Sequence, residues 1–220
     1  MTNLVDLSHP IEHGMTTYPG FPTPVISEWL TRDASRARYA PGTTFQITNI
    51  DMVANTGTYI DAPVHRFEKG ADIGDYPLGA VADLPGIVIH ATERAGRAVD
   101  ADRFTQRDLK GKAVLVHTGW DAHWRKESYG SGHPFLTRAA AERLVAAGVA
   151  LVGIDSMNID DADDGTRPVH TALLAAGIAI VEHMCNLGAL PDAGFRFFAV
   201  PPAVRGMASF PVRAFALVRG

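Results

Sequence analysis

The pattern of apolar and polar residues differs between the two halves of this 220-residue chain. In the first half, residues 45–53 alternate between apolar and polar side chains, as a strand with one buried face does. Two short β-branched runs follow at residues 86–90 and 113–117, and such runs are typical of buried strands. The first half is therefore expected to consist mainly of strands.

Helix and strand alternate in the second half. A helix is predicted over residues 137–147, because Thr137 is a good N-cap and a glycine follows the last helical residue. The apolar run 149–154 is the next expected strand. Pro168 fits the first turn of a second helix, and residues 178–182 form the strand after it. This alternation after a strand-rich half predicts an α/β domain with a mixed sheet.

The length of the chain suits one domain with a substantial core. No internal repeat, low-complexity stretch or linker divides it, so residues 1–220 are expected to form a single domain. Residues 1–44 are rich in Pro, Gly and Thr and show little periodicity. They are predicted to form an extended, loop-rich arm that lies over the core.

Composition and charge exclude several classes of partner. The net charge of −4 gives no reason to expect nucleic acid or an anionic membrane. No apolar run reaches the length of a membrane span, and Met1–Asp6 lacks the pattern of a signal peptide. The single cysteine, Cys185, cannot form an intrachain disulfide. We therefore predict a cytoplasmic protein that acts on a small molecule, without a nucleic-acid or membrane partner.

The densest group of chemically capable side chains lies in residues 55–65, which read Asn-Thr-Gly-Thr-Tyr-Ile-Asp-Ala-Pro-Val-His. In an extended segment, Tyr59 and Asp61 point to the same side. The bend expected at Pro63 can then bring His65 back toward them. This segment is the leading candidate for an active site.

Two residues far downstream extend the candidate site. His170 lies in the first turn of the second predicted helix, and Glu182 ends the strand that follows it. Ligands of α/β sheets gather at the carboxyl ends of strands and at the N-termini of helices, so we expect these two side chains to lie close together. The sequence thus predicts an oxygen–nitrogen set for Zn²⁺ or Mn²⁺, made of Asp61, His65, His170 and Glu182.

These residues also carry a resemblance to a known family. Residues 55–65 are similar to the pattern H-x-G-T-H-x-D-x-P-x-H of the cyclase family, which includes bacterial kynurenine formamidases and isatin hydrolases. Further stretches resemble the family in the same order, so that the likeness covers nearly the whole chain: Asp6–Ile11, Tyr18–Gly20, His117–Trp120, Gly153–Ser156, His170–Leu174, Val181–Glu182 and Phe210–Arg213.

The resemblance implies an α/β fold with a twisted, partly barrel-like sheet and flanking helices, and a homodimer or homotetramer. It also implies metal-dependent hydrolysis of formamides, lactams or related amides. Two histidines of the family pattern are replaced here, by Asn55 and Tyr59. A neutral amide and a phenol with a pKa near 10 are poor ligands for Zn²⁺. The metal position that depends on those histidines is therefore expected to be lost or weakened.

Three functions stay open from the residues. The leading one is hydrolysis of a small amide, formamide or lactam by metal-activated water, with His65 as acid/base and Glu182 in the catalytic set. Tyr59 and Asn55 would donate hydrogen bonds to the oxyanion. The second is a metal-independent isomerase, dehydratase or lyase acting on a small carbonyl compound through His65 and Tyr59. The third is a binding protein without catalysis.

Other residues receive weaker interpretations. Arg213 can bind a substrate carboxylate or pair with a structural acid. His183 follows Glu182 on a strand and is expected to face the opposite side. The acidic run Asp160–Asp164 lacks EF-hand spacing and is predicted to be a solvated turn. Four aromatic residues are candidates for lining a pocket for an aromatic substrate: Tyr18, Phe21, Trp120 and Phe210.

Overall fold

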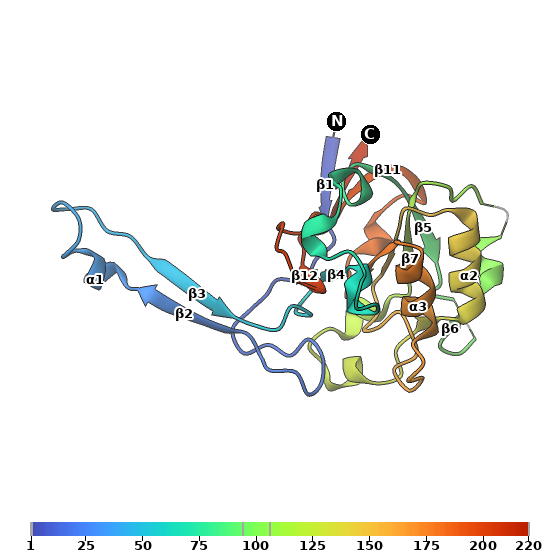
Figure 1. Cartoon of the computed structure of the whole chain (residues 1–220), viewed down its shortest axis with the longest axis horizontal. Coiled ribbons are helices and arrows are strands. Elements are labelled where there is room, and N and C mark those ends of the chain that lie inside the picture. Colours follow the sequence, from blue (N-terminus) through green and yellow to red (C-terminus); the bar gives the residue numbers. More distant parts are fainter. Residues whose placement is uncertain (1, 94, 106, 220) are drawn as a thin grey trace.

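The structure, a computed structural model, describes residues 2–93, 95–105 and 107–219 and is built around a curled nine-stranded sheet (Figure 1). The strand order is β1-β13-β11-β5-β7-β9-β10-β4-β12. The strands are β1 (Thr2–Asp6), β4 (Tyr59–Asp61), β5 (Leu84–His90), β7 (Ala113–His117), β9 (Leu151–Ile154), β10 (Ala179–Glu182), β11 (Ala193–Phe198), β12 (Ser209–Pro211) and β13 (Phe215–Arg219).

The sheet is mixed, as predicted. β5, β7, β9 and β10 are parallel neighbours in its centre, whereas the strands on both sides of this group pair antiparallel. The curl of the sheet gives it the form of a partial barrel, which confirms the predicted α/β class and its twisted, partly barrel-like sheet. The order of the parallel strands also brings their carboxyl ends to a common edge, where ligands of such sheets bind.

Two helices lie side by side on one face of the sheet (Figure 1), α2 (Arg138–Ala147) and α3 (Pro168–Ala175). α2 begins where predicted, because the Thr137 hydroxyl accepts a hydrogen bond from the backbone N–H of Ala140. It ends at Gly148, which takes the left-handed conformation with a φ of 69°. Shorter 3-10 turns complete the body: η1 (Pro63–His65), η2 (Ile73–Asp75), η3 (Leu78–Ala80), η4 (Ala101–Phe104), η5 (Trp120–His123), η6 (Glu127–Gly130) and η7 (Leu187–Ala189).

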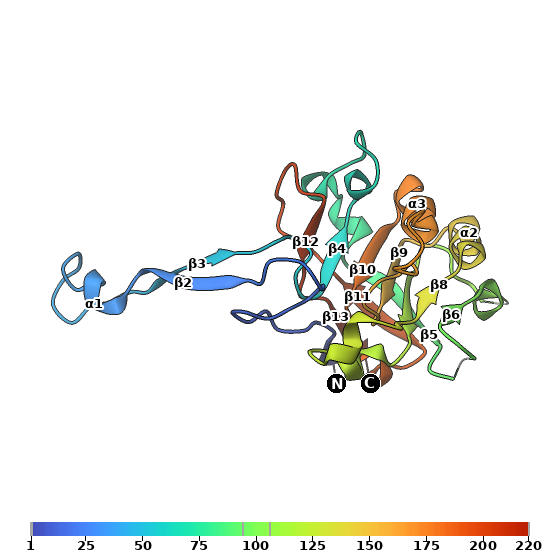
Figure 2. The same ribbon diagram turned by 90° about the horizontal axis from the view of Figure 1, so that it is seen from below.

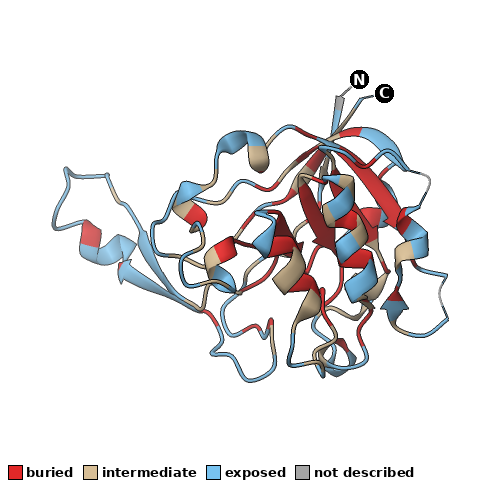
Figure 3. Cartoon of the chain, turned by 45° about the vertical axis from the view of Figure 1, so that its right-hand side comes forward, coloured by how far each residue is buried: buried red, intermediate tan, exposed pale blue. Residues whose placement is uncertain are grey.

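Alternate side chains of the central strands build two hydrophobic clusters. Along β7, Leu115 joins the cluster inside the curl of the sheet, whereas Val114 and Val116 join the cluster under the helices. Leu144 of α2 and Leu173 of α3 belong to this second cluster. The buried residues therefore concentrate in the sheet and in its helix-covered face (Figure 3).

A two-stranded hairpin projects from this body (Figures 1 and 2). It consists of β2 (Val25–Leu30) and β3 (Ile47–Asp51), with the four-residue helix α1 (Arg32–Ser35) near its tip. Within residues 1–44 the structure also places β1, which pairs with β13 over five residue pairs and so belongs to the main sheet. A second small pair, β6 (Ala98–Val99) and β8 (Phe135–Leu136), is parallel.

The predicted strand at residues 45–53 is present as β3, but it lies in the hairpin and all its residues are exposed. Its alternation of apolar and polar residues therefore does not mark one face packed on the core of this chain.

Among the described residues, no helix combines the length and the apolar character that crossing a lipid bilayer requires.

The turn that follows η1 depends on Gly70. A Cβ at this position would lie 2.5 Å from the carbonyl carbon of Pro63 and 2.6 Å from the backbone nitrogen of Val64. Because both are backbone atoms, Gly70→Ala must displace η1, and we expect it to lower the free energy of unfolding by about 1–3 kcal/mol in denaturant titrations. Gly79→Ala is the matched control, since nothing lies within 4 Å of the added carbon. Equal stability of the two variants would contradict this role of Gly70.

Candidate active site

The candidate site is anchored on β4, the three-residue strand between β10 and β12. Its antiparallel register places Tyr59 opposite Glu182 and Asp61 opposite Ser209. Ladder hydrogen bonds fix the distances between residues directly opposite each other, so these partners are held by the sheet and not by a loop. In this way the sheet joins segments that are far apart in the sequence.

His65 returns toward β4 because the chain bends directly after Asp61. Pro63 begins the 3-10 turn η1, and the backbone N–H of His65 donates to the carbonyl of Ala62 at 2.8 Å. The imidazole Nδ1 then lies 3.2 Å from the Ser209 hydroxyl and 3.9 Å from Asp61 Oδ1. The His65 side chain keeps 34% of its surface exposed, so it remains accessible from solvent.

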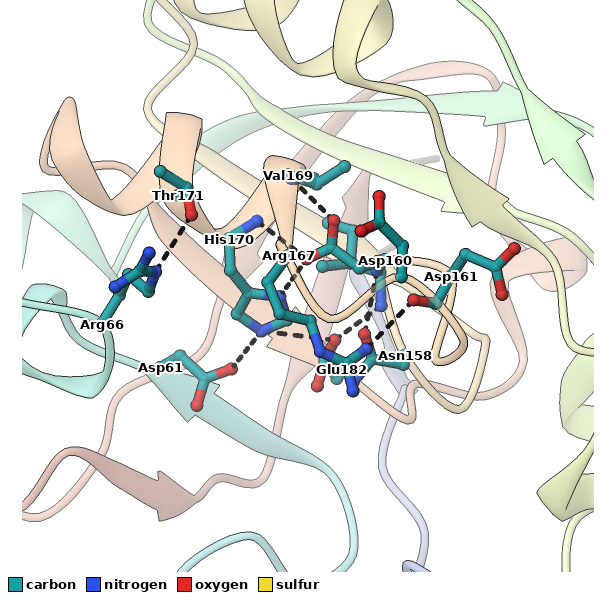
Figure 4. A network of polar contacts seen from close by, with 12 residues as sticks. Asp61, Arg66, Asn158, Asp160, Asp161, Arg167, Val169, His170, Thr171 and Glu182 are labelled. Atoms are coloured by element: carbon teal, nitrogen blue, oxygen red, sulfur yellow. Dashed lines mark hydrogen bonds and ion pairs between the residues drawn. The ribbon is translucent and has the colours of Figure 1, made fainter.

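His170, in the first turn of α3, is held by Asp160 (Figure 4). Asp160 Oδ2 accepts hydrogen bonds from the backbone N–H of His170 at 3.0 Å and from its Nδ1–H at 2.7 Å, and Oδ1 accepts from the N–H of Val169 at 2.7 Å. The carboxylate thereby satisfies the first free amides of the helix. With Nδ1 occupied, His170 Nε2 lies 3.7 Å from Asp61 Oδ2 and 3.7 Å from Glu182 Oε1.

Glu182 is buried at the end of β10, and both of its carboxylate oxygens accept hydrogen bonds. The Tyr59 hydroxyl donates to Oε2 at 2.6 Å, and the backbone N–H of Ile159 donates to Oε1 at 2.6 Å. Burial raises the pKa of Glu182 to about 7, although the charge of His170 opposes this. Burial also raises the pKa of Tyr59 well above 10, so the phenol keeps its proton.

Asp61 is fully buried, and one of its two oxygens lacks a hydrogen bond from the described part of the chain. The Ser209 hydroxyl donates to Oδ1, whereas Oδ2 has no hydrogen-bond partner among the described residues. Burial raises the pKa of Asp61, but the neighbouring imidazoles of His170 and His65 outweigh burial and lower it overall. Burial in turn lowers the pKa of His170, but the charge of Glu182, the hydrogen bond to Asp160 and the nearby carboxylate of Asp61 raise it to about 10. The site thus favours positive charge beside Asp61 Oδ2.

These donor atoms fit a divalent cation. One ligand atom each from Asp61, His65 and His170 lie within 4.8 Å of one another. The unpartnered Asp61 oxygen and the attraction of positive charge to the same point are what a cation position requires. Carboxylate oxygen with imidazole nitrogen is a donor set that suits Zn²⁺ and Mn²⁺. Glu182 borders this position, since its Oε1 is 3.7 Å from His170 Nε2.

A cavity of about 430 Å³ opens onto the site. Tyr18 and Phe21 contribute aromatic rings to its wall, with centroids 5.2 Å apart. Arg66 and Arg167 add positive charge to the same wall. The lining residues are Tyr18, Phe21, Asn55, Tyr59, His65, Arg66, Asn158, Arg167, His170 and Glu182.

Other candidate residues lie elsewhere. The Trp120 ring stacks on His123, and Phe210 packs against the cluster inside the curl of the sheet. Arg213 forms an ion pair with Asp6, so it serves a structural acid and not the cavity. None of these three residues lines the 430 Å³ cavity at the candidate site.

Two residues that follow Glu182, the last residue of β10, are also structural. His183 is buried, and its Nδ1 lies 2.9 Å from the Tyr129 hydroxyl. Burial lowers the pKa of His183 to about 3, so this imidazole is neutral. Cys185 is buried as well, and burial raises the pKa of its thiol to about 12. An imidazole with so low a pKa is a weak base, and a thiol that keeps its proton is a weak nucleophile, so neither suits a catalytic role.

The prediction of a solvated turn at Asp160–Asp164 is wrong for Asp160. Its carboxylate is fully buried and bonds to the first turn of α3, because only this end of the acidic run packs beneath the helix. Ser209 is a second residue that the sequence reasoning missed; it accepts from Asn55 Nδ2 at 3.2 Å and donates to Asp61. In the sequence, the one feature that could have indicated burial of Asp160 is the apolar Ile159 before it. For Ser209, the one such feature is its position next to Phe210.

Known proteins resemble this chain over its whole length. A family model described as putative cyclase matches residues 5–161. A kynurenine formamidase of Paracidovorax citrulli is 32% identical, over 96% of this chain and 94% of that protein. A second kynurenine formamidase, from Bordetella avium, is 28% identical over 97% of each chain.

A solved structure gives the same result. A potential metal-dependent hydrolase with cyclase activity superposes with a TM-score of 0.82 and 26% identity, and 100% of each chain is covered. Because the family model covers most of the chain and the formamidase relatives span nearly all of it, sequence and fold agree. The chain therefore belongs to the cyclase family.

Proposed function

We propose that this protein hydrolyses the C–N bond of a small amide, formamide or lactam with the help of one divalent cation, Zn²⁺ or Mn²⁺. The observation that carries the proposal is that His65, His170 and Glu182 line one open cavity. The buried carboxylate of Asp61 adjoins them, with its Oδ2 3.7 Å from His170 Nε2. Membership of the cyclase family and the kynurenine formamidase relatives support a hydrolase that acts on non-peptide C–N bonds.

The cation position is proposed at Asp61 and His170, bordered by Glu182. A cation bound there supplies polarisation of the substrate carbonyl and lowers the pKa of water from about 16 toward about 7. Asp160 fixes His170 so that Nε2 faces this position, and Tyr59 fixes Glu182 by its hydroxyl. Asn55 and Tyr59 are therefore not needed as ligands, which fits their replacement of the two family histidines.

His65 is proposed as the acid/base. The Ser209 hydroxyl donates a hydrogen bond to Asp61, so its oxygen accepts one from the Nδ1–H of His65, and Nε2 is left as the basic nitrogen. Nε2 can then take a proton from water and return it to the leaving nitrogen. Asn55, which lines the cavity, is proposed to donate to the developing oxyanion.

The cavity wall indicates the kind of substrate. Tyr18 and Phe21 present apolar rings and favour an aromatic group. Arg66 and Arg167 favour a substrate that also carries a negative charge. We propose a small aromatic amide with an anionic substituent, and a cytoplasmic location, which the single, buried cysteine supports.

The projecting hairpin supports a homodimer or homotetramer. It exposes large apolar side chains on both strands, including Trp29 with 66% and Ile50 with 46% of its surface accessible. An isolated two-stranded hairpin is at best marginally stable in water, and a contiguous apolar patch marks an interaction surface. We propose that this hairpin packs against a second copy of the chain. Its exposed apolar residues are Val25, Ile26, Trp29, Tyr39, Phe45, Ile47 and Ile50.

Metal content and hydrolysis separate the roles of Asp61 and His65. We expect Asp61→Ala to lose both the bound Zn²⁺ or Mn²⁺ and the hydrolysis of an aryl formamide, because it removes the unpartnered oxygen. His65→Ala is expected to keep the cation but to lower kcat about 100-fold or more. Asp163→Ala, whose side chain is 90% exposed, is the control. Full activity of the chelator-treated protein, without restored metal, would refute the metal-assisted mechanism.

Asp160 is expected to act by positioning His170. Asp160→Asn keeps the shape of the side chain but weakens the bond to Nδ1–H, so we expect the affinity for Zn²⁺ to fall about 10–100-fold in a competition titration. Asp164→Asn is the matched control, because Asp164 is half-buried and its side chain bonds within its own turn, to the backbone N–H and the hydroxyl of Thr166. An unchanged affinity in folded Asp160→Asn protein would contradict the positioning role.

The hairpin interface is tested by its most exposed aromatic residue. We expect Trp29→Asp to convert the oligomer to monomer in sedimentation velocity experiments, because a charge then replaces apolar surface in the contact. Leu78→Asp is the control, since Leu78 is 69% exposed but lies outside the hairpin. A monomeric wild-type protein, or a Trp29→Asp protein with unchanged mass, would rule out this interface.

A further inference from the structure

Two imidazoles meet at the carboxyl ends of adjacent parallel strands, outside the substrate cavity. His90 is the last residue of β5 and His117 the last residue of β7, and the register places them opposite each other. Their Nδ1 atoms are 3.1 Å apart, and the rings cross at an interplanar angle of 73°. Neither residue lines the cavity described above.

Each of the two rings has a carboxylate near its other nitrogen. Asp192 Oδ1 lies 3.0 Å from His90 Nε2, and Asp155 Oδ2 lies 4.0 Å from His117 Nε2. A carboxylate at one nitrogen of a histidine draws the proton there and leaves the other nitrogen as a donor of electrons, an arrangement that is common around metal-binding histidines. The hydrogen bond to Asp192 therefore favours the proton of His90 on Nε2 and leaves its Nδ1 free to face His117. At His117, Asp155 is beyond hydrogen-bond distance and attracts the proton toward Nε2 through its charge alone.

The spacing of the two Nδ1 atoms suits a common ion. Imidazole nitrogens bind Zn²⁺ at about 2.0–2.1 Å, so two of them at an angle of about 90–110° lie about 2.8–3.4 Å apart. The observed 3.1 Å falls in this range. Gly188 packs against His117, since a Cβ there would lie 3.0 Å from the ring Cε1, and this limits rotation of the ring.

The site is open to ions from solvent. The His90 side chain is 43% exposed, and Asp192 is 74% exposed, so water can complete the coordination. We propose that His90 and His117 form a second cation site, for Zn²⁺, Ni²⁺ or Cu²⁺, separate from the site at Asp61. An ion held there joins the ends of β5 and β7 and stabilises the folded chain, because it binds the native state.

Zinc titration of chelator-treated protein tests this site. We expect His90→Asn to bind one Zn²⁺ fewer per chain than wild type, or to bind the more weakly held Zn²⁺ at least about tenfold less tightly. Hydrolysis is expected to be unchanged. His13→Asn is the matched control, because His13 is an exposed histidine that accepts a hydrogen bond from the backbone N–H of Ile26. We expect the control to bind as wild type does.

The same titration in Asp61→Ala protein separates this proposal from the proposed function. One Zn²⁺ that persists in Asp61→Ala and disappears when His90→Asn is added supports the second site, whether or not the first binds. Equal zinc binding by folded wild-type and His90→Asn protein would overturn it. Anomalous diffraction from wild-type crystals soaked in Zn²⁺ needs no variant: a peak about 2 Å from both Nδ1 atoms supports the site, and its absence overturns it.

Discussion

The pairing of β4 with β10 and β12 is the constraint on which the candidate active site depends. β4 has only three residues, yet its ladders set Tyr59 against Glu182 and Asp61 against Ser209. Helix α3 then adds His170 from the adjoining crossover, held by Asp160. The site is therefore rigid where it holds charge, and its more exposed member, His65, sits on the short turn that follows β4.

Burial explains why these side chains form one electrostatic unit. Asp61, Asp160 and Glu182 are all inaccessible to solvent or nearly so, and buried carboxylates must be bonded or paired with positive charge. Backbone amides, Tyr59 and Ser209 satisfy most of their oxygens. Without a bound cation, a proton on His170 supplies the compensating charge, because the surrounding carboxylates raise its pKa to about 10. The remaining unpartnered oxygen of Asp61 marks where a cation would complete the balance.

The sequence predicted the elements of the fold better than their partners. Periodicity and capping located α2 and α3, because Thr137 and Pro168 act within their own turns. The strand at 45–53 was predicted, but its placement in a projecting hairpin was not, since alternation does not say which surface a strand packs on. Asp160 was missed for a related reason. Its contacts are made across ten residues with a helix, and composition of the acidic run does not distinguish it from its solvated neighbours.

The hairpin is joined to the wall of the cavity by two short connections. β2 starts four residues after Phe21, and β3 ends four residues before Asn55, so both strands run directly into residues of the cavity wall. A tilt of the hairpin is transmitted through these short connections to the aromatic side of the wall and to the Asn55 amide. The shape of the cavity is consequently coupled to any contact that fixes the orientation of the hairpin, although such a contact lies well outside the cavity.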